Sequence, residues 1–128
     1  MSRPISSLMQ RRVWTVDMDD TVAQVGDLLA EHELTWAPVV ESGRVIVGVI
    51  SAPDLLQFHK QGGDAKKTRA WQLCTYKPIS VDETTPVGDV ARAMVERRVH
   101  HVVVTRGGAG IVGVVSSLDF VRTFVEVA

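Results

Sequence analysis

Two short stretches of the chain place a serine and an aspartate three residues apart, directly after an apolar run that contains a glycine. Ser51 and Asp54 follow Val-Gly-Val-Ile, and Ser116 and Asp119 follow Val-Gly-Val-Val. Such a run predicts a buried strand that passes directly into a helix. At the helix N-terminus, where free backbone N–H groups point outward, a carboxylate can accept hydrogen bonds from both hydroxyls of a ribose, and a serine hydroxyl can bind a phosphate.

The same four residues also have a structural interpretation. A serine followed by an acidic residue three positions later has the spacing of a capping box, in which two side chains satisfy backbone N–H groups at a helix start. Caps of this kind are common, so one copy alone would favour capping. A cap and a ligand site can coexist, and for Ser51 and Ser116 both roles stay open.

The two stretches belong to a longer duplication. Gly113 stands 65 positions after Gly48 (113 − 48 = 65), and sliding the chain by that amount without a gap aligns many more residues. Matching pairs include Leu8 with Leu73, Val25 with Val90, Gly43 with Gly108, and Ile46–Val49 with Ile111–Val114. A period this long, present twice, is outside the range of solenoid repeats and indicates a duplicated unit folded as a pseudo-symmetric pair.

Each copy is predicted to fold as β-α-β-β-α. In the first copy, Thr21 with Gln24 forms a capping-box signal before an amphipathic helix. The expected elements are a short helix at 5–10, strands at 14–16, 37–40 and 45–50, a helix with Val22, Val25, Leu28 and Leu29 on one face, and a helix from Pro53 to about Lys60.

The second copy repeats this order after a polar, glycine-bearing linker. Its expected elements are strands at 79–81, 101–105 and 111–115, a helix at 86–97 with Val87, Val90, Met94 and Val95 inside, and a last helix from about Leu118. The predicted organisation is a first repeat over 5–60, a linker over 61–69 and a second repeat over 70–127, all in one compact module.

This order of elements predicts the α/β class (α+β-like), with helices packed against small sheets. One copy is too small to bury both of its faces well, so the two copies are predicted to pack sheet to sheet as a pseudo-two-fold pair. That packing would leave two symmetry-related clefts where strand ends meet helix starts.

The composition argues against several classes of partner. The chain has 128 residues, with 14 basic and 15 acidic side chains and a formal net charge of -1, which gives no strong electrostatic attraction to nucleic acid or to an anionic membrane. No apolar run approaches the length that spans a bilayer. The single cysteine, Cys74, cannot form an internal disulfide, fits a reducing cytoplasm and is interpreted as a small core residue.

The two copies together resemble a pair of CBS domains, also called a Bateman module, from about Ile5 to Phe124. The matching segments are LTWAPVV at 34–40 with Gly43 and Gly48–Ser51, and VHHVVV at 99–104 with Gly108 and Gly113–Ser116. The resemblance implies a stand-alone regulatory binding module rather than an enzyme. Members sense adenosine-containing ligands such as AMP, ADP, ATP or S-adenosylmethionine, often act on a partner protein, and usually form dimers.

The resemblance also implies roles for individual residues. Asp54 and Asp119 would bind ribose hydroxyls, and together with the duplication this favours ligand binding over capping alone. The residues that would line the adenine are Val13, Thr15, Pro78, Ile79 and Ser80. An ordinary short core strand is the alternative interpretation of both segments.

His100 and His101 stand where members of the family often carry basic residues that touch phosphate. A histidine there could bind an anion, better when protonated, or the pair could be a surface feature at a strand start. Because neighbouring strand residues face opposite sides, at most one of them would point into a given cleft. No further Cys/His cluster accompanies the pair, so no metal site is predicted.

The first copy has Thr35 and Trp36 at the positions of the two histidines. Trp36 could stack on a base, or it could fill the core or a dimer contact, and packing is the favoured interpretation. This departure predicts that the two clefts do not bind phosphate equally.

Three functions can be compared. The first is a sensor whose ligand shifts the population of conformations that a protein partner recognises. The alternative is a ligand-free dimerisation or scaffold module. An enzyme is disfavoured, since the sequence has no nucleophile–base–acid grouping, no metal-ligand cluster and no P-loop, and no cofactor is predicted.

Overall fold

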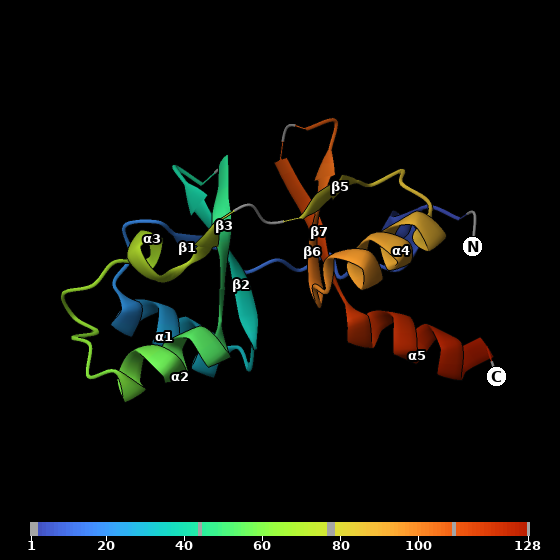
Figure 1. Cartoon of the computed structure of the whole chain (residues 1–128). Helices are drawn as coiled ribbons and strands as arrows, with labels where there is room; N and C mark the ends of the chain where they lie inside the picture. The colour runs from blue at the N-terminus through green and yellow to red at the C-terminus, as the bar shows by residue number, and fades with distance from the viewer. Residues whose placement is uncertain (1–2, 44, 77–78, 109, 128) are drawn as a thin grey trace. The chain divides into compact units, whose positions relative to one another are not determined.

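The computed structural model describes residues 3–43, 45–76, 79–108 and 110–127 (Figure 1). The elements in chain order are a 3₁₀ helix η1 (Ile5–Ser7), β1 (Val16–Asp17), α1 (Val22–Glu31), β2 (Trp36–Glu41), β3 (Val45–Ser51), α2 (Ala52–Lys60), α3 (Ala70–Leu73), β4 (Thr75–Tyr76), β5 (Ser80–Asp82), α4 (Val87–Arg97), β6 (His101–Arg106), β7 (Gly110–Ser116) and α5 (Ser117–Val127). They divide into two compact units, which we call the first-repeat unit (residues 14–78) and the second-repeat unit (residues 1–13 with 79–128). Two small sheets with helices confirm the predicted mixed α/β class.

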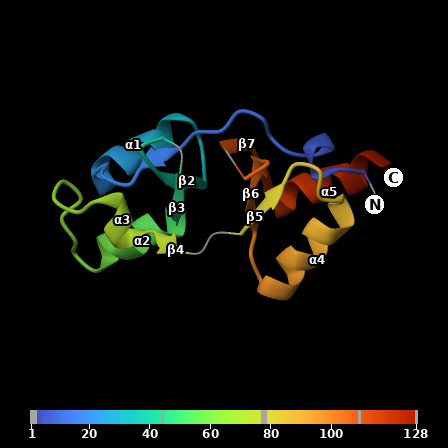
Figure 2. The same cartoon turned by 90° about the horizontal axis from the view of Figure 1, so that it is seen from above.

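The first-repeat unit contains the sheet β1-β2-β3-β4, in which β1 is parallel to β2 and the other neighbours are antiparallel. Helices α1 and α2 contact each other and lie on one side of this sheet (Figures 1 and 2). Thr21 caps α1, because its side chain accepts the backbone N–H of Gln24 while the Gln24 side chain accepts the backbone N–H of Thr21. This capping box confirms the predicted helix start, and Val22, Val25 and Leu29 follow at helical spacing and are buried.

The second-repeat unit contains the sheet β5-β6-β7, with β5 parallel to β6 and β6 antiparallel to β7. Figures 1 and 2 show α4 and α5 on the same side of it. Val87, Val90 and Met94 of α4 are buried as predicted, but the prediction for Val95 was wrong, since its side chain is 78% exposed. Val95 lies about 100° around the helix from Met94, beyond the face that the core covers.

Each unit is completed by residues from outside its own repeat. Ile5 begins the first repeat, yet it is fully buried in the core of the second-repeat unit, and its N–H donates to the carbonyl of Thr85 at 2.7 Å. The helix predicted at 5–10 covers only Ile5–Ser7, because Gln10 forms an antiparallel bridge with Val114 of β7. The start of the second repeat likewise supplies α3 and β4 to the first-repeat unit.

Two equivalent glycines make room for these added segments. In the first-repeat unit, a Cβ at Gly48 would lie 2.4 Å from the carbonyl oxygen of Thr75, because β4 pairs with β3 at this point. In the second-repeat unit, a Cβ at Gly113 would lie 2.4 Å from Met9 Sδ and 3.0 Å from the carbonyl oxygen of Gln10. The close approach that the glycines allow is therefore made by other segments of the same chain.

Cys74 lies in the core of the first-repeat unit, which confirms its interpretation as a core residue. Burial raises the pKa of its thiol, and the nearby Asp54 carboxylate adds to the increase. The thiol is therefore protonated at neutral pH and is a weak nucleophile.

The first strand begins two residues later than predicted. Trp14 stacks on the ring of His32, with ring centroids 3.6 Å apart and an interplanar angle of 14°. Only Val16 and Asp17 pair with β2, opposite Val39 and Val40. The indole of Trp14 thus packs on the end of α1, and β1 comprises only the two residues after Thr15.

Candidate ligand-binding sites

Ser51 and Asp54 form the first candidate site, where β3 passes into α2. The backbone N–H of Ser51 donates to Asp54 Oδ2 at 2.9 Å, and the backbone N–H of Asp54 donates to Ser51 Oγ at 3.3 Å, so the pair is a capping box. Both residues are half-buried. Within the described residues Asp54 Oδ1 accepts no hydrogen bond, which leaves one carboxylate oxygen available to a ligand.

Ser116 and Asp119 form the equivalent site, where β7 passes into α5. The backbone N–H and the hydroxyl of Ser116 both donate to Asp119 Oδ2, at 2.8 and 3.2 Å. Gln10 Nε2 donates to the other oxygen, Oδ1, at 3.0 Å. Asp119 is 6% exposed, and among the described residues it is the one charged side chain that is buried. Hydrogen bonds from the protein itself therefore stabilise its charge.

In both serine–aspartate pairs the two residues form hydrogen bonds with each other at the start of a helix. Their role in stabilising the helix start is therefore observed. The first turn also keeps backbone N–H groups available, and negative groups are stabilised there by the helix dipole. Because a cap and a ligand site can share these atoms, binding of ribose or phosphate at the two pairs stays a prediction.

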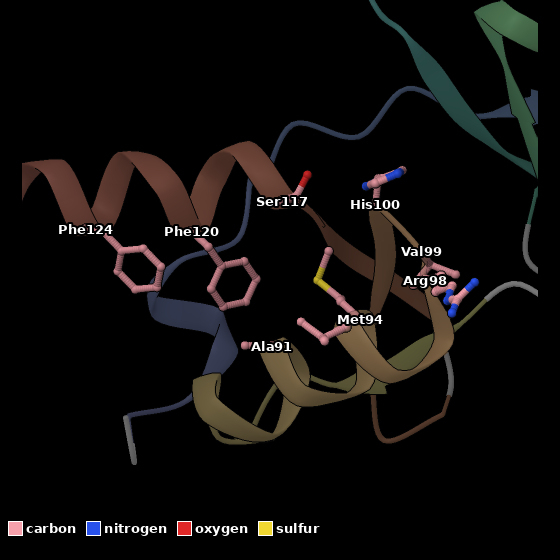
Figure 3. Close-up of a pocket in the computed structure, with 9 residues that line it drawn as sticks. Ala91, Met94, Arg98, Val99, His100, Ser117, Phe120 and Phe124 are labelled. Atoms are coloured by element: carbon pink, nitrogen blue, oxygen red, sulfur yellow. The ribbon is translucent and has the colours of Figure 1, made fainter.

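The two histidines lie in different surroundings. His101 is half-buried and is the cross-strand partner of Ser116. Burial, and after it the neighbouring His100, lower the pKa of His101 to about 4, while the Asp119 carboxylate acts in the opposite direction. His101 is therefore neutral at pH 7, where it can offer an anion a hydrogen bond but no positive charge. His100 is exposed and lines an apolar cavity between α4 and α5 (Figure 3).

Trp36 holds in the first-repeat unit the position that His101 holds in the second. It is half-buried and is the cross-strand partner of Ser51. The residue paired with the candidate serine is thus an indole in one copy and an imidazole in the other. The two sites therefore have different chemical surroundings.

The residues expected to line an adenine are spread over both units. Thr15 is exposed and precedes β1 in the first-repeat unit, whereas Val13 is half-buried and belongs to the second-repeat unit. Ile79 is half-buried, its carbonyl accepts a backbone N–H of β6 at 3.0 Å, and Ser80 begins β5. Pro78 lies outside the described residues. An adenine pocket formed by these segments stays a prediction.

A polar cavity of about 290 Å³ lies beside Asp119. Its lining residues are Arg3, Ser7, Leu8, Gln10, Asp119, Arg122 and Thr123. Two arginines and a carboxylate thus line an opening close to the lower end of ligand-pocket volumes. The sequence analysis missed Arg3, Gln10 and Arg122. Only Arg122 has a sequence signal, since it follows Asp119 by about one helical turn.

An apolar cavity of about 440 Å³ lies between α4 and α5. Figure 3 shows Phe120 and Phe124 pointing from α5 toward Ala91 and Met94 of α4. Two of the side chains that line it are largely exposed, Val95 on α4 and Phe124 on α5. An exposed apolar groove of this kind is typical of a contact with another molecule.

In the described part of the chain, no three His, Cys, Asp or Glu side chains lie close enough together to hold a metal ion. The described helices also include none that combines the length and the apolar character needed to cross a membrane.

Comparisons with known proteins agree with this architecture. The family model of the CBS domain matches the chain twice, over residues 5–60 and 70–126. The uncharacterized protein MJ0188 of Methanocaldococcus jannaschii is 32% identical over 129 residues, a match that covers 98% of this chain and 46% of that protein. The chain therefore spans about half the length of this relative.

Solved structures share the fold along almost the whole chain. The CBS domain pair of protein MJ0100 in complex with 5′-methylthioadenosine and S-adenosyl-L-methionine has a TM-score of 0.88 at 22% identity and covers 100% of both chains. The CBS domain of the bacterial CNNM/CorC family Mg²⁺ transporter in complex with ATP has a TM-score of 0.86 at 25% identity, and the match covers 96% of this chain and 87% of that one.

Proposed function

Because the chain belongs to the CBS domain family, we propose that it is a regulatory module that binds an adenosine-containing ligand at the serine–aspartate pairs of its two repeats. The observation that carries this proposal is the repeated placement of a carboxylate, Asp54 or Asp119, in the first turn of a helix that directly follows a strand. The ligands in the two related complexes, S-adenosylmethionine with methylthioadenosine and ATP, have an adenosine moiety in common.

The proposed ligand is AMP, ADP, ATP or S-adenosylmethionine, held in a cleft between the repeats. The carboxylates of Asp54 and Asp119 accept the ribose hydroxyls, and Ser51 and Ser116 bond a phosphate or carboxylate together with N–H groups at the helix start. Val13, Thr15, Pro78, Ile79 and Ser80 supply backbone and apolar contacts to the adenine. Since His101 is neutral at pH 7, positive charge near Asp119 comes from Arg3 and Arg122 instead.

The proposed output is a change of conformation rather than catalysis. A ligand that binds one arrangement of the repeats better than another shifts the population toward that arrangement, and its differential affinity limits the size of the shift. A protein partner, still to be identified, would recognise the favoured arrangement. The single, buried cysteine is compatible with action in the cytoplasm.

A homodimer is part of the proposal. The specific observation is the exposed apolar face of α4 and α5, where Val95 is 78% and Phe124 is 55% exposed beside the apolar cavity. Apolar patches of this kind mark contacts between proteins. We therefore place the contact between two copies of the chain on this face.

A thermal-shift screen with AMP, ADP, ATP and S-adenosylmethionine tests ligand binding, since a ligand that prefers the folded state raises its stability. Adenosine and 2′,3′-dideoxyadenosine form the matched pair for the ribose contacts. The proposal expects the dideoxy compound to bind more weakly, and it expects Asp54→Asn and Asp119→Asn each to remove one class of site. Equal affinity for both nucleosides would rule out ribose recognition by these carboxylates.

The alternative is a ligand-free dimerisation or scaffold module, which the same apolar face favours. It predicts a stable dimer and no stabilisation by any of the four adenosine compounds. Calorimetry on protein of known oligomeric state separates the two functions. A sensor would dimerise and also show a heat of binding when ligand is added, whereas a scaffold would only dimerise.

A further inference from the structure

Both carboxylate oxygens of Asp119 accept hydrogen bonds from the protein before any ligand arrives, whereas only one oxygen of Asp54 does so among the described residues. Ser116 donates twice to Asp119 Oδ2, and Gln10 Nε2 donates to Oδ1 at 3.0 Å. Asp54 accepts one backbone N–H at Oδ2. The side chain of Gln10 is thus one feature that distinguishes the two carboxylates, and the one that occupies the oxygen left open in Asp54.

The position of Gln10 is fixed by its backbone. Its N–H donates to the carbonyl of Val114 at 2.8 Å, and its carbonyl accepts the N–H of Val114 at 3.0 Å. Gly113 leaves the space that this approach requires. The main chain of Gln10 is therefore held beside β7, and only its exposed side chain needs to move to release Asp119.

The equivalent position in the other copy carries a shorter side chain. Sliding by 65 residues brings Gln10 onto Thr75, which pairs with Val49 of β3 just as Gln10 bridges β7. Among the described residues no hydrogen bond joins Thr75 to Asp54. The difference at this carboxylate oxygen thus follows from side-chain length, because the amide of Gln10 reaches Asp119 and the hydroxyl of Thr75 does not bond to Asp54.

We infer that Gln10 acts as a built-in competitor of the ligand and makes the second-repeat site weaker than the first, an inference that rests on the proposed function. An amide N–H on a carboxylate oxygen is the same kind of bond that a ribose hydroxyl would form, so a ligand at Asp119 exchanges one bond for another. A ligand at Asp54 gains its bond without displacing a side chain. Because Asp119 is almost fully buried, the ribose can reach Oδ1 only after the amide has left.

The two sites therefore fill in order, the first-repeat site at lower ligand concentration and the second-repeat site at higher concentration. A bond to a charged group is strong enough for its loss to change affinity by about tenfold. In this proposal the side chain of Gln10 determines the order in which the two sites fill.

Reciprocal exchange of the two side chains tests the inference. The probe is the compound among AMP, ADP, ATP and S-adenosylmethionine that gives the largest thermal shift, and affinity is measured by calorimetry. In protein that carries Asp54→Asn, so that only the second-repeat site remains, Gln10→Thr is expected to tighten binding about tenfold. In protein that carries Asp119→Asn, Thr75→Gln is expected to weaken binding, while Gln10→Thr leaves it unchanged.

A second readout follows the amide itself. The side-chain NH₂ resonances of Gln10, assigned by their loss in Gln10→Thr, should move when the ligand fills the second-repeat site of Asp54→Asn protein. They should stay in place when the ligand is added to Asp119→Asn protein. A residue with a merely structural role would keep its resonances unchanged in both titrations.

The outcomes separate the inference from the proposed function. If neither the wild-type chain nor Gln10→Thr binds any of the four compounds, the proposed function fails and the inference fails with it. If ligand binds at Asp119 but Gln10→Thr leaves its affinity unchanged or lowers it, Gln10 does not compete with the ligand. In that case the inference alone is overturned and the adenosine site stands.

Discussion

Ser116 donates both its backbone N–H and its hydroxyl to the same oxygen of Asp119, at 2.8 and 3.2 Å. The two bonds join the end of β7 to the first turn of α5, at the only buried carboxylate among the described residues. The pair therefore stabilises the strand-to-helix passage whether or not a ligand is present.

Removing the hydroxyl tests this structural role. Ser116→Ala leaves the backbone bond but removes the hydroxyl bond to a buried charge, so it is expected to lower the free energy of unfolding by about 1 kcal/mol. Urea denaturation followed by circular dichroism measures the change. Ser117→Ala is the control, because Ser117 is exposed and its substitution should change stability by less than about 0.5 kcal/mol. Equal effects of the two substitutions would contradict the cap.

The space at Gly113 and Gly48 can be tested by adding one methyl group. An alanine at Gly48 would place Cβ 2.4 Å from the backbone carbonyl oxygen of Thr75, so one of the two strands must shift. At Gly113 the Cβ would lie 2.4 Å from the Met9 side chain, which can move, and 3.0 Å from the backbone carbonyl oxygen of Gln10. We expect Gly48→Ala to lower the free energy of unfolding by about 1–3 kcal/mol, and Gly113→Ala to lower it by a smaller amount. Gly110→Ala on the same strand β7 is the matched control, since a Cβ there meets nothing within 4 Å. If Gly113→Ala were as stable as Gly110→Ala, the crossing of residues 9–10 beside β7 would be wrong.

The lowered pKa of His101 predicts that the folded chain loses stability in acid. Its pKa is lowered from 6.5 to about 4 in the folded chain, mainly by burial and then by His100, against the opposing Asp119. Between pH 6.5 and pH 4 the unfolded chain therefore binds more protons at this residue than the folded chain, and stability is lost as the pH falls through this window. Over this pH window, we expect the free energy of unfolding of His101→Gln to fall by roughly 2 kcal/mol less than that of the wild-type chain. This figure is reduced from the full effect of the pKa shift because His101 is partly exposed. Parallel denaturation curves of both proteins at pH 7, 5.5 and 4.5 measure the difference, and curves that fall equally would contradict the shift.

The residue that ends α4 has a strained backbone conformation, which a substitution can relieve. Arg98 follows the helix with φ 55°, in the left-handed region that glycine adopts more readily, and Glu33 after α1 has φ 54° at the equivalent position. Arg98→Gly is expected to raise the free energy of unfolding by about 0.5–1 kcal/mol. Arg97→Gly, within the helix, should lower it by about 1 kcal/mol. A destabilising Arg98→Gly would show that the Arg98 side chain contributes more than the backbone strain.

The apolar face of α4 and α5 predicts the position of a dimer contact. Phe124→Glu places a charge on this face, and because Phe124 is 55% exposed the substitution should leave the subunit folded. If the proposed homodimer forms through this face, the substitution is expected to raise its dissociation constant by about tenfold or more, as measured by analytical ultracentrifugation. Arg92→Ala, exposed on α4 and not part of the cavity lining, should leave the equilibrium unchanged.

Local patterns in the sequence predicted the elements well, because each rests on neighbours along the chain. The Thr21–Gln24 capping box and the spacing of Val87, Val90 and Met94 are of this kind. The same spacing also placed Val95 inside, yet only the surroundings of α4 decide which of its sides is covered. The duplication likewise predicted that both serine–aspartate pairs begin a helix.

Contacts that are distant in sequence left no such pattern. Gln10 reaches Asp119 through a backbone bridge to Val114, and backbone hydrogen bonds do not depend on residue type. The stacking of Trp14 on His32 joins a residue assigned to a strand with the end of a helix. The repeat offset could have aligned Gln10 with Thr75, but only the structure shows that the longer side chain bonds to the carboxylate.

The first segment of each repeat packs in the unit of the other repeat, and this determines which fragments of the chain keep a complete core. A fragment that ends at the repeat boundary near residue 60 would lose Ala70 and Cys74 from its interior and would expose the edge of β3 that β4 covers, inviting intermolecular strand pairing. A fragment over 14–78 retains both, and it gives up only residues that pack elsewhere. The natural border for dissecting this protein therefore lies inside the duplicated sequence rather than between its copies.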